Sequence, residues 1–261
     1  MKKELHIFFT ALMFYTRIPC PENINHHPDY LNKASRYFPL IGWIVGVLSF
    51  LVYFVSGFVF SNEIAVLLSM ITGILVTGAF HEDGFADVCD GFGGGWTKEK
   101  ILMIMKDSAI GAYGAIGLVL LFLLKFESLV ELIRINQSSN FEILLLFLVA
   151  HAVSRLAAIS IVFTHEYSRE DATSKSKPIA KAYSWREVLG AFFFGLFPLL
   201  LLSCFYWQIW AVLLPVFLSR FFLARYFQKW IGGYTGDCLG ATQQLCEVVF
   251  YLSSIAIWKF I

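Results

Sequence analysis

The stretch FPLIGWIVGVLSFLVYFVSGFVF, residues 38–60, contains no charged side chain. A helix of about 20 apolar residues is long enough to cross the roughly 30 Å hydrocarbon core of a bilayer. The stretch therefore predicts a transmembrane helix. Further apolar segments follow it, and the seven predicted spans cover about 38–60, 64–80, 110–125, 141–163, 188–205, 208–225 and 244–261.

The composition of the whole chain also indicates a membrane protein. Of the 261 residues, 58% are hydrophobic and only 15% are charged, whereas about 25% charged residues is usual for a soluble domain. The net charge of +1 offers no basic footprint for nucleic acid, and the five cysteines lack zinc-site spacing. We predict one all-α domain over residues 1–261, a polytopic transmembrane helical bundle that contacts the lipid bilayer.

The N-terminal residues predict a helix that lies on the membrane surface. Apolar side chains recur at helical spacing and polar ones lie beside them, which is typical of an amphipathic interfacial helix. A cleaved signal peptide is the alternative, but no small-residue cleavage site follows. The residues concerned are Leu5, Phe8, Phe9 and Leu12, with Lys2, Lys3, Glu4 and His6.

Lysine and arginine are distributed unevenly among the predicted loops. Most precede the first span or follow the second, fourth and sixth, while the alternate loops carry only Lys125, Arg134 and Lys259. Basic loops are retained in the cytoplasm. We therefore expect a cytoplasmic N-terminus, an outer C-terminus, and cytoplasmic positions for Cys89 and Cys238.

An acidic motif, HEDGFADVCDGFGGGW at residues 81–96, follows the second predicted span. Asp83, Asp87 and Asp90 are spaced four and three apart, so a helix would place them on one face. Such carboxylates repel one another unless a cation lies between them, and Mg²⁺ prefers oxygen ligands. The motif predicts a Mg²⁺ site, with Glu82 off the acidic face as a bystander. A hydrated helix end is the alternative interpretation.

A second polar cluster, KDSAIGAYG at residues 106–114, precedes the third predicted span. Lys106 could contact a phosphate, and Asp107 and Ser108 could cap the next helix, whose N-terminal amides favour anions. We take all three as candidate substrate-binding residues. Capping and anchoring alone explain the cluster equally well.

A third cluster, GGYTGDCLG at residues 232–240, precedes the last predicted span, and Glu247 follows it. Acids at a membrane boundary are costly unless they are paired or bound to a ligand, so Asp237 and Glu247 are candidates to complete the metal shell. A simple turn between helices is the alternative. The residues expected to approach the substrate here are Gly232, Gly233, Thr235 and Gly236.

Arg155 lies inside the predicted span 141–163, one helical turn after His151. An intramembrane arginine indicates a functional site, and a substrate phosphate or a structural ion pair would each account for it. A general base is also needed for an alcohol nucleophile. His81 and the acids of the 81–96 motif remain alternatives for that role.

The order of these motifs resembles the cobalamin synthase family, the adenosylcobinamide-GDP ribazoletransferases. H-x-D-G-x-x-D-x-x-D-G at 81–91, M-K-D-S-x-x-G-x-Y-G at 105–114 and G-G-Y-T-G-D-x-L-G-A at 232–241 carry the resemblance, together with F-Y-T-R-I-P at 14–19. The resemblance implies transfer of α-ribazole, or its 5′-phosphate, to adenosylcobinamide-GDP with release of GMP. It further implies that Mg²⁺ is required and that the product is adenosylcobalamin or its 5′-phosphate, late in coenzyme B12 biosynthesis.

We accordingly expect a multi-pass protein of the bacterial inner membrane whose active site faces the cytoplasm. A homo-oligomer, or docking with other late enzymes of that pathway, is compatible with the sequence. A CDP-alcohol phosphotransferase is one alternative, but the arginine of its D-x-x-D-G-x-x-A-R motif is missing. A divalent-cation transporter is the other, although its acids would be expected near the membrane midplane.

Overall fold

The computed structural model describes residues 2–24, 27–136, 139–168 and 183–260. These residues form α-helices and short 3₁₀ segments, with one isolated bridge between Tyr167 and Tyr234. The chain is therefore an all-α polytopic protein, as predicted. Its helices are α1 (Lys2–Tyr15), α2 (Pro28–Ala34), η1 (Ser35–Tyr37), α3 (Phe38–Ser56), α4 (Asn62–Thr77), α5 (Phe80–Gly94), α6 (Lys98–Ile104), α7 (Ala112–Asn136), α8 (Asn140–Val162), α9 (Trp185–Ser203), η3 (Trp207–Val212), α10 (Leu213–Ile231) and α11 (Gly236–Trp258).

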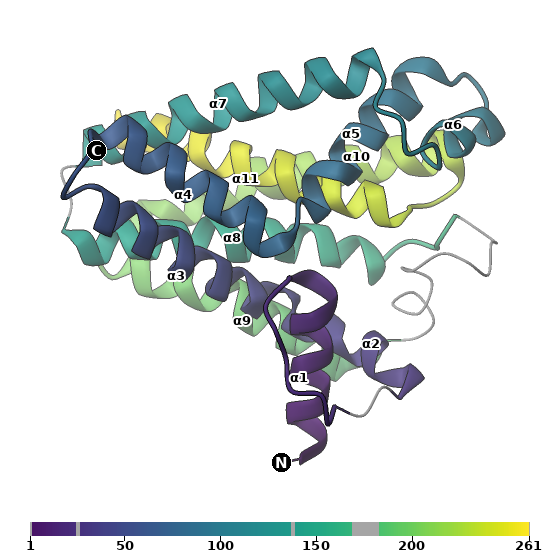
Figure 1. Cartoon of the computed structure of the whole chain (residues 1–261), viewed down its shortest axis with the longest axis horizontal. Helices are drawn as coiled ribbons and strands as arrows, with labels where there is room; N and C mark the ends of the chain where they lie inside the picture. Colours follow the sequence, from purple (N-terminus) through teal and green to yellow (C-terminus); the bar gives the residue numbers. More distant parts are fainter. Residues whose placement is uncertain (1, 25–26, 137–138, 169–182, 261) are drawn as a thin grey trace.

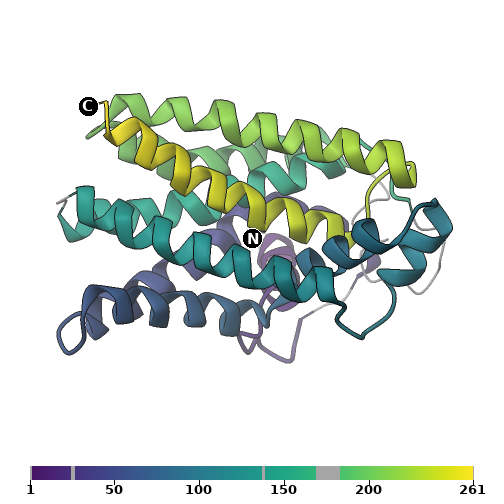
Figure 2. The ribbon, with the colours of Figure 1, turned by 90° about the horizontal axis from the view of Figure 1, so that it is seen from above.

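The long helices run side by side along the longest axis of the molecule (Figures 1 and 2). Helix α8 forms their centre, because nearly all of its side chains from Ile143 to Val162 are buried. It packs against α3, α9 and α11. A helix that is apolar on every side can bury its surface only among other helices, which explains the inner position of α8.

Each of the seven predicted spans coincides with helical structure. Four segments are long and apolar enough to cross a bilayer, and α4 with α5 forms one further candidate that is bent by 88°. The helices α7 and α11 are not among them, so the number of seven spans stays a prediction. The four segments are Asp29–Ser56, Asn140–Val162, Trp185–Ser203 and Trp207–Ile231.

Helix α7 is longer than the predicted span 110–125. It continues to Asn136, so Lys125 lies in the middle of a helix and is buried. Its assignment to an outer loop was therefore wrong. The opposite end of the bundle then retains only Arg134 and Lys259 among the basic residues counted there, which strengthens the charge asymmetry used to predict orientation.

Helix α1 runs across the direction of the bundle helices (Figure 1). One side of it is buried through Ile7, Ala11 and Leu12, while Leu5 is 55% exposed. A helix in this direction would lie along the membrane surface if the long helices cross it. The arrangement supports the interfacial interpretation.

The break between α4 and α5 sets the direction of the acidic helix. Gly78 and Ala79 have φ values of 68° and 58°, and these two left-handed residues stop α4 and turn the chain. A Cβ atom on Gly78 would lie 2.1 Å from Arg17 Nε, and the Phe14 and Tyr15 rings contact the ring of Phe80. The N-terminal F-Y-T-R segment therefore packs on this turn.

Candidate active site

Helix α5 carries the three predicted acids on one face. At about 100° per residue, Asp83, Asp87 and Asp90 fall within about 60° of one another around the helix axis. Asp83 is exposed, and Asp87 and Asp90 are partly buried. The helical spacing predicted from the sequence is thus present, and this acidic face borders the end of the bundle that holds α6.

Helix α11 crosses α5 at very short range and brings a fourth acid to the same region. A Cβ atom on Gly84 would lie 2.9 Å from Asp237 Cα, and one on Gly240 would lie 3.0 Å from the carbonyl oxygen of His81. Only glycine at these positions lets the two backbones approach so closely. The crossing places Asp237, in the first turn of α11, beside the turn of α5 that joins Asp83 to Asp87.

Asp90 makes contacts that its place in the acidic motif does not predict. Its carboxylate accepts hydrogen bonds from the backbone N–H groups of Gly111, at 2.7 Å, and Gly114, at 2.8 Å. These are amides at the start of α7, which lack partners within the helix. Asp90 therefore caps α7 and ties it to α5, while its role as a metal ligand stays a prediction.

The cluster 106–108 lies in the exposed connection between α6 and α7. Asp107 accepts a hydrogen bond from Ala109 N–H at 3.1 Å, so it forms a local turn. Lys106 and Ser108 are also exposed. Asp90, and not Asp107 or Ser108 as predicted, caps α7. Substrate binding by Lys106, Asp107 and Ser108 remains a prediction.

The glycine-rich connection 232–236 is held in place by the segment that follows α8. Tyr234 N–H donates to the Glu166 carbonyl at 3.1 Å, and Ser168 N–H donates to the Tyr234 carbonyl at 2.9 Å. Thr235 caps α11 by accepting from Cys238 N–H. Gly232, Gly233, Thr235 and Gly236 therefore end α10 and start α11, which accounts for their residue types without a substrate.

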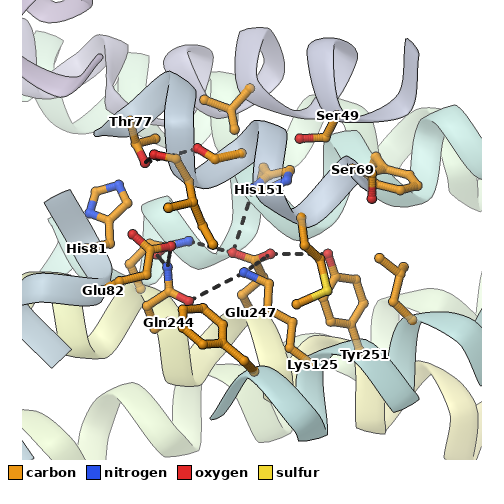
Figure 3. Close-up of a pocket in the computed structure, with 18 of the residues that line it drawn as sticks. Ser49, Ser69, Thr77, His81, Glu82, Lys125, His151, Gln244, Glu247 and Tyr251 are labelled. Atoms are coloured by element: carbon orange, nitrogen blue, oxygen red, sulfur yellow. Dashed lines mark hydrogen bonds and ion pairs between the residues drawn. The ribbon is translucent and has the colours of Figure 1, made fainter. Parts of the chain in front are cut away.

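A second group of polar side chains lies buried inside the bundle, with Glu247 at its centre (Figure 3). Lys125 Nζ is 2.7 Å from Glu247 Oε1, and Tyr251 donates to the same oxygen at 3.2 Å. Gln243 donates to Oε2 at 2.8 Å, and His151 Nδ1 lies 3.7 Å from it. Glu247 is thus the hub of an ion pair and hydrogen-bond network that joins α7, α8 and α11.

This position differs from the metal-ligand role expected for Glu247. Ten residues of one helix separate Asp237 from Glu247, a rise of about 15 Å. A single Mg²⁺ ion, with ligands at about 2.0–2.1 Å, cannot be held by both. The sequence placed the two acids in one cluster because they are near in the chain, whereas the helix carries Glu247 inward to Lys125.

Glu82 lies off the acidic face, as predicted, and belongs to the same buried network; its small effect on activity stays a prediction. It is only 6% exposed, and its Oε1 accepts a hydrogen bond from Gln244 Nε2 at 2.8 Å. Gln244 in turn contacts Gln243 and Lys125. The network therefore links α5, immediately before Asp83, to α7 and α11. The charged residues in the apolar runs were the only sequence feature that could have revealed it.

His81 and Arg155 line the buried pocket that also contains Glu247, Lys125 and Glu82. Figure 3 shows His81 at one side of this pocket. Arg155 is 1% exposed and donates to the carbonyl of His151 at 3.0 Å, one turn earlier on α8. His81 is 2% exposed, and its ring packs against Phe38 and Phe80. His81 projects from the opposite side of α5 to Asp83, so the geometry favours an acid as the general base.

The acidic face has the chemistry that a Mg²⁺ site needs. The four candidate ligands, Asp83, Asp87, Asp90 and Asp237, are all carboxylates. Mg²⁺ is usually bound through one or two carboxylates, with waters and substrate phosphates as its other ligands. Within the described part of the chain, no three His, Cys, Asp or Glu side chains already converge on one point. A site of one or two carboxylates that is completed by substrate fits both observations.

Comparison with known proteins identifies the family. A family described as cobalamin-5-phosphate synthase matches residues 7–255. The chain belongs to this family. No solved structure matches it.

Two relatives of this cobalamin-5-phosphate synthase family member show how complete the similarity is. A protein from Shewanella amazonensis is 46% identical over 259 residues, which cover 99% of this chain and 98% of that protein. One from Shewanella frigidimarina is 45% identical over 255 residues, 98% of this chain and 96% of that protein. Both are named adenosylcobinamide-GDP ribazoletransferase. The resemblance drawn from the motifs is confirmed, and the protein is a transferase of cobalamin biosynthesis.

Proposed function

We propose that this protein joins α-ribazole, or α-ribazole 5′-phosphate, to adenosylcobinamide-GDP. Membership of the cobalamin-5-phosphate synthase family over residues 7–255 carries the proposal, and the near-complete match to proteins named ribazoletransferase supports it. A ribazole hydroxyl oxygen forms a bond to the phosphorus that bears cobinamide, and the bond from that phosphorus to GMP breaks. The products are adenosylcobalamin, or its 5′-phosphate, and GMP.

Mg²⁺ is the cofactor in this proposal. One or two carboxylates among Asp83 and Asp87 on α5 and Asp237 on α11 would hold it, with waters and substrate phosphates as its other ligands. Asp90 is a fourth candidate through lone pairs that the α7 amides leave unused. When bound, the metal neutralises charge on the substrate diphosphate, which is the main requirement of phosphoryl transfer. The close contact of Gly84 with the Asp237 backbone supports this assignment, because it packs the acid-bearing turns of the two helices against each other.

Groups of the protein itself would orient the phosphates, add positive charge and accept the proton. The N-terminal amides of α11 would orient phosphate oxygens, since a helix N-terminus favours anions. Lys106 would add positive charge from the exposed connection before α7. A carboxylate of the acidic face would accept the proton of the ribazole hydroxyl, because the buried His81 faces away from it.

We further propose that the acidic face lies at the cytoplasmic side of the bacterial inner membrane. The asymmetry of basic residues supports this orientation, as do the apolar helices that are long enough to cross a bilayer. The nucleotide substrate is then supplied from, and GMP released to, the cytoplasm.

The decisive experiment combines purified protein with adenosylcobinamide-GDP, α-ribazole and Mg²⁺. Mass spectrometry should detect adenosylcobalamin and GMP in equal amounts, and neither product should form when ribazole or Mg²⁺ is omitted. GMP release that does not depend on ribazole would indicate simple hydrolysis and would contradict the transfer. Product formation in the presence of a chelator would contradict the role of Mg²⁺.

A further inference from the structure

A cleft of about 570 Å³ opens between the N-terminal half of α1, the α2–η1 segment and the first turn of α9. It is separate from the acidic face, since Figure 1 places α1 and α2 on the other side of the bundle from α6. Its volume is within the range of small-molecule sites. The charged and amide side chains that line it are Lys3, Glu4, Asn32, Lys33, Arg36, Arg186 and Glu187.

The cleft carries excess positive charge. Its four cations and two acids give a formal charge of +2. Both acids are already paired with Arg36: Arg36 Nη2 lies 2.8 Å from Glu4 Oε2, and Arg36 Nη1 lies 3.7 Å from Glu187 Oε1. Within the described residues, Lys3, Lys33 and Arg186 form no ion pair. Arg186 lies over the ring of its neighbour Trp185, which leaves its charge uncompensated by any acid of the described part of the chain. The three cations therefore supply the excess positive charge of the cleft.

Two buried polar atoms in the cleft also lack partners within the described part of the chain. They are Arg36 Nε, which can only donate a hydrogen bond, and Asn32 Oδ1, which can only accept one. Burying such atoms without partners is costly. A ligand that offers both an acceptor and a donor, such as a phosphate next to a hydroxyl group, would satisfy both.

The position of the cleft indicates the source of that ligand. Two of the segments that are long and apolar enough to cross a membrane, Asp29–Ser56 and Trp185–Ser203, begin at its walls. Helix α1 crosses the bundle direction beside it (Figure 1). Trp185, at its edge, is 67% exposed, and exposed tryptophan is enriched at the level of lipid headgroups. The cleft therefore lies where phospholipid headgroups are found.

We propose that this cleft binds the headgroup of an anionic phospholipid that carries hydroxyl groups, such as phosphatidylglycerol. Lys3, Lys33 and Arg186 attract the phosphate, Arg36 Nε donates to it, and a headgroup hydroxyl donates to Asn32. Basic pockets between membrane helices are known to select anionic headgroups. The bound lipid would hold α1 and α2 against the start of α9.

The test measures lipid retention by the full-length protein. Protein purified in detergent is equilibrated with equal amounts of phosphatidylglycerol and phosphatidylcholine, and retained lipids are counted by native mass spectrometry. The parent should retain phosphatidylglycerol on the order of tenfold over phosphatidylcholine. The combined variant Lys3→Gln, Lys33→Gln, Arg186→Gln should lose this preference, whereas the matched variant Lys100→Gln, Arg225→Gln, Lys229→Gln should keep it.

Several outcomes would overturn the proposal. One is equal retention of both lipids by the parent. Another is equal loss of the phosphatidylglycerol preference in both triple variants, which would indicate diffuse electrostatic attraction. A third is displacement of the lipid by millimolar GMP, which would indicate a nucleotide site. A second measurement uses the parent protein alone, so that its result does not depend on correct folding of the cleft variant. Phosphatidylglycerol should raise the thermal unfolding temperature of the parent in detergent, and phosphatidylcholine should not.

Discussion

Asp83 and Asp87 project from successive turns of α5, and Asp83 is the most exposed acid of the acidic face. Asp90 differs because both of its oxygens accept backbone hydrogen bonds from the start of α7. An Asp90→Asn variant would therefore disturb helix capping as well as charge. The metal hypothesis is tested more cleanly at Asp83 and Asp87.

We predict that Asp83→Asn and Asp87→Asn each lower ribazoletransferase activity on the order of 100-fold, because stabilisation of the developing phosphate charge is lost. GMP release at increasing Mg²⁺ concentration measures the effect. Partial recovery at high Mg²⁺ or with Mn²⁺ is expected of a ligand, whereas a general base would show none.

The matched control is Glu99→Gln, an exposed acid in the first turn of α6 at the same end of the molecule. It should leave activity within about twofold, since surface substitutions have small effects. Parent-like turnover by both aspartate variants would remove the acidic face from the mechanism.

Lys125 and Glu247 form a buried ion pair 2.7 Å long. Removal of one partner leaves a buried charge uncompensated, which costs about 3–5 kcal/mol. We predict that Lys125→Met strongly lowers the thermal unfolding temperature in detergent and that the double variant Lys125→Met, Glu247→Gln recovers much of the loss. A double variant no more stable than Lys125→Met would show that the pair has no electrostatic role.

At the scale of helices, the contact between α5 and α11 determines which acids meet. Gly84 lies under the first turn of α11, and a Cβ atom there would approach the Asp237 backbone, which cannot move aside as a flexible side chain can. The relative position of Asp237 and the acids of α5 therefore depends on the absence of one side chain.

We predict that Gly84→Ala lowers activity by about 100-fold, because displacement of a catalytic group by about 1 Å has effects of that size. Gly94→Ala is the control. It lies on the same helix and meets only the end of the Ile104 side chain at 3.3 Å. Turnover of both variants should be compared at saturating Mg²⁺; equal activities would mean that the crossing does not position the acids.

At the scale of the whole molecule, the two ends of the bundle differ in charge and can be told apart by labelling. Cys238, which we expected to report the cytoplasmic side, is fully buried and unsuitable, and Cys89 is partly buried. Cys204 is exposed at the end of α9, which the orientation assigns to the outer side.

We predict that a membrane-impermeant thiol reagent labels Cys204 in intact spheroplasts. In a Cys204→Ser background, Lys100→Cys should be labelled only after the membrane is opened, because Lys100 lies on α6 beside the acidic face. Labelling of Lys100→Cys in intact spheroplasts of this background, without labelling of Cys204 in those of the parent, would reverse the orientation.

Local patterns in the sequence were sufficient to predict the helices, the common helical face of Asp83, Asp87 and Asp90, and the protein family. These features depend on apolar runs and on residue spacing within one helix, which the chain encodes directly. Only the tertiary structure showed that Asp237 reaches α5 while Glu247 pairs with Lys125, and that Glu82 bonds to Gln244. Those contacts join residues more than 100 positions apart, and the packing of one helix on another decides them. Near neighbours in the chain, such as Asp237 and Glu247, are carried about 15 Å apart by the same helix.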